Sequence, residues 1–332
     1  MEIGGGDMNI DLSLKGVLAK SVSYKTKKKV GNIIIAIFKY LFLITIGYIV
    51  IYPLLHAVSM SFRTPVDYLD SGVTWIPNNP TLDNFKNAIV CLNLPDSFWS
   101  TVRLELVAAA IEVAACSITA YGFSRFKFRG HNILMFCLML TLFIPPQMTI
   151  VPMIANFSHL DFLGILSLLS KILKADIRPN ILDTPLTFYL PSLFSNGLRS
   201  GMLIYIYIQF FKGMPKELEE AAWIDGANPF RTFLSIVLPS SGVVILTVSL
   251  FSLVWHWNDY YLAVMYTSED YPLAVALAQI ETVVKNSISS NVNLIYSIAM
   301  ASCIIFIIPL LLIYIVLQKK FIQSIDRIGI TG

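Results

Sequence analysis

Six long apolar runs dominate this chain of 332 residues. About 20 predominantly apolar residues in a helix cross the hydrocarbon core of a bilayer. A membrane β-barrel would instead show short segments of alternating hydrophobicity, which these runs do not. The sequence therefore predicts an all-α polytopic membrane protein. Its six transmembrane helices are expected at about residues 33–59, 99–123, 132–155, 186–209, 236–262 and 293–317.

The composition agrees with a membrane protein. Hydrophobic residues make up 56% of the chain and charged residues 14%, whereas roughly a quarter of the residues in typical soluble domains are charged. The net charge of +3 is too small to indicate binding to nucleic acid. The expected surroundings are therefore a lipid bilayer, and the open question is what the chain transports or senses.

The basic residues predict an orientation, because cytoplasmic loops carry an excess of Lys and Arg. With the N-terminus inside, 15 of the 24 basic residues lie on the cytoplasmic side and 6 on the outer side. Both termini are then cytoplasmic: an N-terminal segment 1–32, which is too polar to be a signal peptide, and a tail 318–332. The transmembrane region between them, 33–317, holds all six spans.

The segment 210–235, between the fourth and fifth predicted spans, has the most informative pattern. Pro215 suits the first turn of a helix, and the acidic residues that follow it suit a helix N-terminus. Leu218, Ala221 and Ala222 give one apolar face, and Gly226 suits a tight reversal before a second helix. This pattern fits either a solvated loop with helical propensity or a rigid docking element for a cytoplasmic partner.

The same segment resembles a known signature. Glu220-Ala221-Ala222, Gly226 and Ile236-Val237-Leu238-Pro239 stand at the spacing of the coupling loop of bacterial binding-protein-dependent ABC importer membrane subunits. The resemblance implies the type I importer permease fold. It also implies that this loop docks in a cleft of an ATP-binding subunit. The residues expected to couple the chain to that subunit are Glu220, Ala221, Ala222, Asp225, Gly226 and Ala227.

Further segments resemble the carbohydrate, maltose-type subfamily, and in particular its smaller permease subunit. They are the basic segment 120–130, the run Ile144-Pro145-Pro146-Gln147, Trp257-Asn258-Asp259 and the tail segment 318–324. The resemblance implies a sugar or oligosaccharide importer in the bacterial plasma membrane. The implied partners are a second homologous permease subunit, an ATPase dimer and an extracellular solute-binding protein. An outer stretch, about 165–184, is longer than is usual in the family.

No catalytic motif accompanies these features. The chain lacks GxxxxGK[ST], HExxH and GxSxG, which are the signatures of a P-loop, a zinc protease and a serine hydrolase. We therefore expect no enzyme, no cofactor and no metal site in this chain, with ATP and Mg²⁺ bound by the partner ATPase. The four cysteines and four histidines are scattered and are interpreted as packing residues.

Glu112 stands well inside the second predicted span, and an acid at that depth is a functional hypothesis by default. It could line the translocation cavity, bind a sugar hydroxyl or pair with a neighbouring helix. Trp257 and Asn258 offer sugar-binding chemistry near the outer end of the fifth span, although interfacial anchoring explains aromatic residues there equally well. Two alternatives to a sugar importer remain open: an ABC importer for another solute, or an ion-driven secondary carrier.

Overall fold

The computed structural model describes residues 7–70, 72, 75–161 and 164–329, and it divides into two units, 1–59 and 60–332. Its described residues form helices and loops with no β-strand, as the sequence predicts. The first unit contains all but the last two residues of α1, Asp7–Ser61. The predicted cytoplasmic segment 1–32 is therefore helical from Asp7 and continuous with the first apolar run, while residues 1–6 and, in the tail, 330–332 lie outside the described residues.

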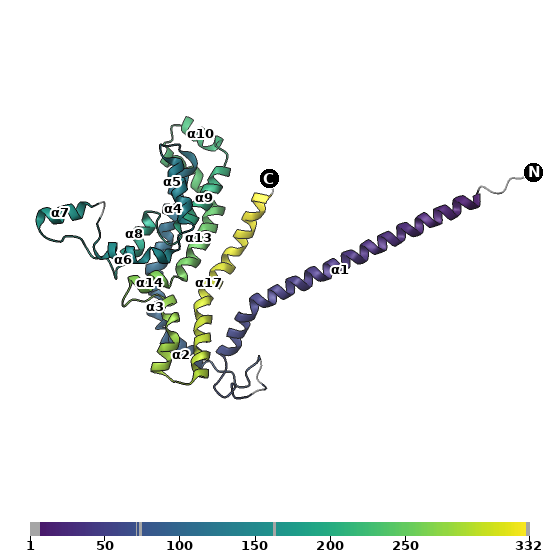
Figure 1. Cartoon of the computed structure of the whole chain (residues 1–332), viewed down its shortest axis with the longest axis horizontal. Helices are drawn as coiled ribbons and strands as arrows, with labels where there is room; N and C mark the ends of the chain where they lie inside the picture. Colours follow the sequence, from purple (N-terminus) through teal and green to yellow (C-terminus); the bar gives the residue numbers. More distant parts are fainter. Residues whose placement is uncertain (1–6, 71, 73–74, 162–163, 330–332) are drawn as a thin grey trace, which may run out of the picture. The chain divides into compact units, whose positions relative to one another are not determined.

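The second unit contains the remaining helices (Figure 1). They are α2 (Asp83–Cys91), α3 (Leu94–Thr101), α4 (Val107–Arg125), α5 (His131–Thr141), α6 (Ile150–Ser158), α7 (Ile165–Leu173), α8 (Leu186–Leu193), α9 (Ser200–Gly213), α10 (Glu217–Ile224), α11 (Pro229–Thr232), α12 (Leu238–Ser240), α13 (Gly242–Trp257), α14 (Tyr261–Tyr266), α15 (Leu273–Ala278), α16 (Ile280–Ser287) and α17 (Val292–Gly329). Three further turns are the π-helices η1 (Val102–Leu106) and η3 (Phe233–Val237) and the 3₁₀-helix η2 (Pro146–Met148).

Three described helices are long and apolar enough to cross a bilayer. They are Asn32–Ser61, Leu94–Arg125 and Val292–Gln318, and they match the first, second and sixth predicted spans. A fourth candidate is the pair Pro229–Ser240 and Gly242–Trp257, which is bent by 82° and includes most of the fifth predicted span. The predicted count of six spans is therefore not confirmed.

The third and fourth predicted spans are each divided between two helices. The third consists of α5 and α6, and Pro145 and Pro146 stand at the break between them. The fourth consists of α8 and α9, separated by a turn in which Ser195 and Arg199 have positive φ. Proline removes a backbone donor and clashes with a preceding turn of helix, and a positive φ takes the backbone out of the right-handed helix. Continuous helices are therefore excluded at both places.

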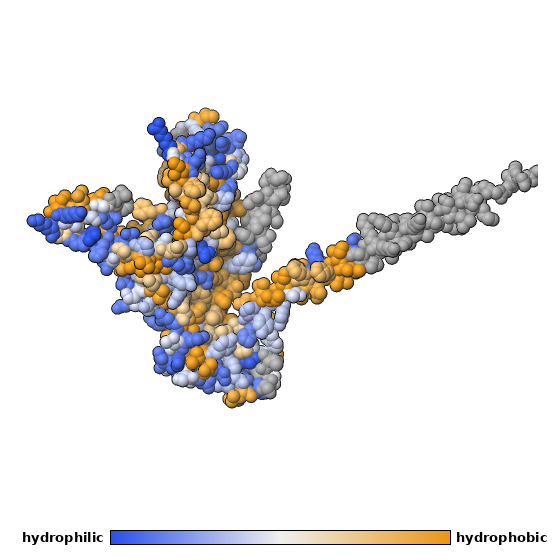
Figure 2. Space-filling model, viewed as in Figure 1, coloured by the Kyte–Doolittle hydropathy of each residue, from blue (hydrophilic) through white to orange (hydrophobic). Residues whose placement is uncertain are grey.

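The core of the second unit forms where α4 packs against α9 and α13. Small residues on α4, among them Ala108, Cys116 and Ala120, are fully buried and let the neighbouring helices approach closely. Tyr207 and Phe211 on α9 fill the remaining space and are fully buried. On the face shown in Figure 2, hydrophilic residues gather around α10 at one end of this unit, and apolar residues lie next to them. This arrangement places segment 210–235 at the end of a tightly packed helical core.

The outer stretch 165–184 contains α7. Its exposed Ile165, Leu168 and Ile172 make one side of this helix apolar (Figure 2). Residues 162–163, which precede this helix, are outside the described residues. Further along, the Asp183 carboxylate accepts hydrogen bonds from the Ser268 backbone N–H at 2.6 Å and hydroxyl at 2.5 Å.

Candidate functional site

The segment 210–235, called the coupling loop below, contains both short helices that its sequence predicts. The first is α10, and its first turn holds Glu217, Glu219 and Glu220. The second is α11, which begins at Pro229 and runs into η3. The side chain of Asn228 caps α11, because its Oδ1 accepts a hydrogen bond from the Arg231 backbone N–H at 2.8 Å. Nearby side chains therefore explain where each of the two helices begins.

Gly226 makes the reversal between the two helices. Its φ of +83° lies in the left-handed region, which costs a residue with a Cβ free energy that glycine does not pay. No heavy atom would come within 4 Å of a Cβ added there. Glycine is therefore required here by the backbone conformation, and not because a side chain would lack room.

The predicted coupling residues lie mainly on the outer face of the loop. Glu220, Ala221, Asp225 and Gly226 are exposed, Ala227 is half-buried and Ala222 is buried. Of Leu218, Ala221 and Ala222, whose spacing predicts one apolar face, only Ala222 is buried. The second residue of α10 that turns inward is a charged one, Glu219.

Glu219 anchors the coupling loop to α4. Its Oε1 lies 2.7 Å from Nε of Arg125, and both side chains are less than 5% exposed. The hydroxyl of Tyr121 donates a hydrogen bond to Oε2 of Glu219 at 3.0 Å. Nη2 of Arg125 also donates to the carbonyl oxygen of Met214, at the end of α9, at 3.1 Å. One guanidinium thus connects α4, the end of α9 and α10.

Large apolar side chains on the coupling loop are exposed. Ile224 is 87% exposed, and Trp223 and Phe230 are also exposed, together with Leu218. Four such residues on two short helices make an apolar patch beside the outward-facing Glu220 and Asp225. A patch of this kind, rimmed by polar residues, marks a surface that contacts another molecule.

A second charged cluster lies inside the core, between α4 and α13. Nδ1 of His256 is 2.8 Å from Oε2 of Glu105, and its Nε2 is 2.9 Å from Oε2 of Glu112. All three residues are at most 3% exposed. Ser200 donates a short hydrogen bond to Oε1 of Glu112, and Ser252 donates to its Oε2 at 3.4 Å. His256 thus packs in the core as a hydrogen-bonded residue, and the sequence does not predict its two carboxylate partners.

The three residues predicted near the substrate have separate surroundings. Both carboxylate oxygens of Glu112 are occupied by the partners just described. Trp257 is 1% exposed, and its Nε1 donates to the Phe306 carbonyl oxygen at 3.2 Å. Asn258 follows the end of α13 and donates to the Val254 carbonyl oxygen at 2.7 Å. The structure brings only Glu112 into the charged cluster, and contact of any of the three with substrate stays a prediction.

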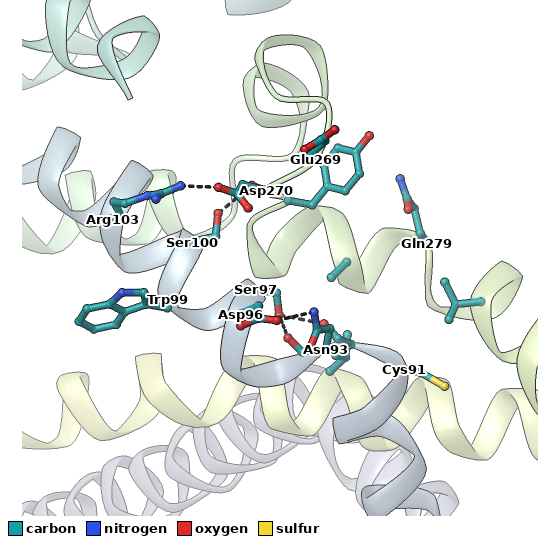
Figure 3. Close-up of a pocket in the computed structure, with 14 residues that line it drawn as sticks. Cys91, Asn93, Asp96, Ser97, Trp99, Ser100, Arg103, Glu269, Asp270 and Gln279 are labelled. Atoms are coloured by element: carbon teal, nitrogen blue, oxygen red, sulfur yellow. Dashed lines mark hydrogen bonds and ion pairs between the residues drawn. The ribbon is translucent and has the colours of Figure 1, made fainter. Parts of the chain in front are cut away.

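A pocket of about 380 Å³ opens at the opposite end of the second unit from α10 (Figures 1 and 3). It lies between α3 and the segment that leads into α15. Arg103 and Asp270 form an ion pair of 2.5 Å across one edge, and Ser100 donates to the Asp270 carbonyl oxygen at 2.7 Å (Figure 3). Burial raises the pKa of the Cys91 thiol on the far side. Among the described residues, no group of three or more His, Cys, Asp and Glu side chains is placed to hold a metal ion.

Sequence relatives of the chain are transport permeases. It is 26% identical over 269 residues, 80% of this chain and 86% of the relative, to a probable starch degradation products transport system permease protein of Thermoanaerobacterium thermosulfurigenes. It is 28% identical over 309 residues, 92% of this chain and 98% of the relative, to a galactooligosaccharides transport system permease protein of Bacillus subtilis. It is also 28% identical over 295 residues, 86% of this chain and 94% of the relative, to a polygalacturonan/rhamnogalacturonan transport system permease protein of the same species.

A solved structure has the same fold. It is a chain of a bacterial ABC transporter involved in the import of the acidic polysaccharide alginate, with a TM-score of 0.65 and 19% identity. The match covers 87% of this chain and 96% of that one. The family model for binding-protein-dependent transport system inner membrane components matches residues 113–327, which include most of α4, the coupling loop and α13. The chain therefore belongs to the family of binding-protein-dependent transport system inner membrane components.

Proposed function

We propose that this chain is a permease subunit of an ATP-driven importer for a sugar or oligosaccharide. The observation that carries the proposal is the coupling loop, whose signature residues Glu220, Asp225 and Gly226 are presented on an exposed face while α10 is anchored from behind. Family membership supports an importer. The relatives named for transport of starch degradation products, galactooligosaccharides and polygalacturonan/rhamnogalacturonan support a carbohydrate as the substrate class.

In this proposal the chain works in a complex in the bacterial plasma membrane, with both termini in the cytoplasm. Its partners are a second homologous permease subunit, an ATPase dimer that binds ATP and Mg²⁺, and an extracellular solute-binding protein. Closure of the ATPase dimer displaces the docked coupling loop. Because α10 is tied to the helical core, the displacement rocks the spans, and the central cavity changes from inside-facing to outside-facing.

The test is reconstitution of the complete complex in proteoliposomes. Loaded binding protein is supplied on one side and ATP on the other, and uptake of radiolabelled maltooligosaccharides and galactooligosaccharides is measured. We expect uptake that depends on ATP and on the binding protein. Uptake that persists without the ATPase and follows an ion gradient would instead establish a secondary carrier. ATP-driven uptake of a small osmolyte, but of no sugar, would establish an importer for another solute.

Gly226→Pro tests the coupling loop itself. Proline fixes φ near −65°, so it cannot adopt the φ of +83° found here. We expect the variant complex to accept loaded binding protein but to lose ATP hydrolysis stimulated by it, together with sugar uptake. Gly226→Asn is the matched control, because asparagine tolerates the left-handed region, and it should retain most of the activity. Wild-type transport by the Gly226→Pro complex would overturn the assignment of the loop.

A further inference from the structure

Two adjacent glutamates of α10 face opposite ways. Glu220 is exposed, whereas Glu219 is 2% exposed and points into the chain's own core. The family signature begins at Glu220, so it gives no role to Glu219. The structure places the Glu219 carboxylate between Arg125 and Tyr121, both from the last two turns of α4. The inward glutamate therefore contacts the permease itself, and the outward one is free to face another subunit.

The buried Arg125–Glu219 ion pair is better explained by positioning than by stability alone. Taking two charges out of water costs free energy that their attraction repays only with good geometry and further hydrogen bonds. An apolar pair of similar volume is often equally stable. The Arg125–Glu219 pair has the further hydrogen bonds, from Tyr121 and to Met214. It fixes the position of α10 relative to α4, which a sliding apolar contact does not do.

Helix α4 can carry a displacement into the core. It is uninterrupted from Val107 to Arg125, so it is about 28 Å long at 1.5 Å per residue. The coupling-loop end is held by the Arg125–Glu219 pair. Between three and four turns away, Glu112 is held to His256 of α13 at 2.9 Å. Both attachments are buried, and they place α4 between α10 and α13.

We propose that Arg125 and Glu219 are a pair of positioning residues that passes the movement of α10 to α4 during transport. The inference rests on the proposed function and adds to it the route by which the loop acts on the spans. Met214 joins this route at the start of the coupling loop, because its carbonyl oxygen shares the Arg125 guanidinium. Neither residue contacts substrate or nucleotide in this role.

The experiment uses the complete reconstituted complex and the ratio of sugar transported to ATP hydrolysed. The first variants are Glu219→Gln, which removes the charge and keeps the shape, and Arg125→Lys, which keeps the charge and loses the forked geometry. We expect each to lower the ratio about tenfold, within the 5–150-fold range typical of coupling between two sites. Co-purification of the ATPase should be unchanged, so that a loss of docking is separated from a loss of transmission.

The double variant Glu219→Gln/Arg125→Lys completes a double-mutant cycle. If the two residues act as one link, the double variant is no worse than either single variant. Asp83→Asn is the matched control, because Asp83 forms an ion pair with Lys86 at a similar 2.8 Å but both side chains are at least 70% exposed. Exposed pairs contribute little, so this variant should keep the wild-type ratio. Wild-type ratios in both single variants, or losses that simply add, would overturn the proposal.

A second measurement does not depend on the sugar. Spin labels at Lys127, just after α4, and at Leu218, on the exposed face of α10, report the distance between the two helices with and without a non-hydrolysable ATP analogue. In the wild-type complex this distance should stay constant, and in Glu219→Gln it should change when the analogue binds. A constant distance in both complexes overturns the link. Failure of every sugar to be transported, with the expected label distances, overturns only the assigned substrate class.

Discussion

His256 connects the two carboxylates of the charged cluster inside the core, those of Glu105 and Glu112. It lies between two buried carboxylates, and its ring nitrogens are within 2.9 Å of both. Removing one partner of a buried charge pair leaves an uncompensated charge, which typically costs about 3–5 kcal/mol. We therefore expect His256→Phe to lower the free energy of unfolding by about that amount, measured by chemical unfolding of the purified chain in detergent.

His159→Phe is the control for this change, because the His159 side chain is 58% exposed, and surface substitutions usually stay within about 0.5 kcal/mol. Equal stability of the two variants would contradict a structural role for the cluster.

Glu112→Gln separates the roles that remain open for Glu112. A pairing role predicts lower stability with an unchanged apparent KM for sugar uptake, whereas contact with substrate predicts a raised KM.

At the residue scale, sequence reasoning found the unusual residues but not their partners. Glu112 is conspicuous because it interrupts an apolar span, and Glu105 lies seven residues earlier on the same face. His256 lies 144 residues further along the chain than Glu112, and nothing local to either residue predicts that separation. Glu219 was missed because the acidic first turn of α10 has an ordinary explanation in the helix dipole.

At the scale of elements, the start of α9 packs closely against α5. A Cβ added to Gly201 would come within 2.3 Å of Oγ1 of Thr141, the last residue of α5. Gly197 and Gly201 are four residues apart, a small-xxx-small spacing that is typical of close helix packing, and the contact with α5 agrees with it. At Gly197 the nearest atoms to an added Cβ belong to Glu112 and Ser192.

We expect Gly201→Ala to lower the melting temperature of the purified chain, because overpacking a well-packed site typically costs about 1–3 kcal/mol. The measurement is a thermal shift assay in detergent. Gly122→Ala is the matched control: Gly122 is also inside a helix, but no atom would come within 4 Å of its added Cβ, so alanine there should be neutral or slightly stabilising. A melting temperature that falls equally in both variants would mean that packing is not the cause.

The helices themselves could be predicted only in part from hydrophobicity. Helices α4 and α17 follow from long apolar runs, and the two short helices of the coupling loop follow from Pro215, Gly226 and Pro229. The breaks inside the third and fourth predicted spans were missed. Pro145 and Pro146 carried the signal for the first break, but an apolar run alone does not distinguish a continuous helix from two helices. The break before α9 has positive φ at Ser195 and Arg199, which their sequence does not signal.

At the scale of the whole molecule, the predicted orientation can be tested by labelling. On a background without the four native cysteines, Lys171→Cys should react with a membrane-impermeant maleimide in intact cells, because its segment is predicted to lie outside. Lys216→Cys, next to α10, should react only after the membrane is permeabilised. Both positions are exposed, so a difference in labelling reports the side of the membrane. Labelling of Lys216→Cys in intact cells would reverse the proposed topology.

The π-helical turn η1 determines how the chain would respond to the loss of one residue. A π-turn holds one more residue per hydrogen-bonded turn than an α-helix, so it amounts to a single inserted residue. Here it joins α3 to α4 and contains Glu105. Because the extra residue is taken up within that one turn, deleting one residue other than Glu105 from 102–106 would restore regular helix while α3 and α4 keep nearly the same rotation relative to each other. A chain shortened by one residue there is therefore expected to fold, and the change falls on the direction in which Glu105 projects toward His256.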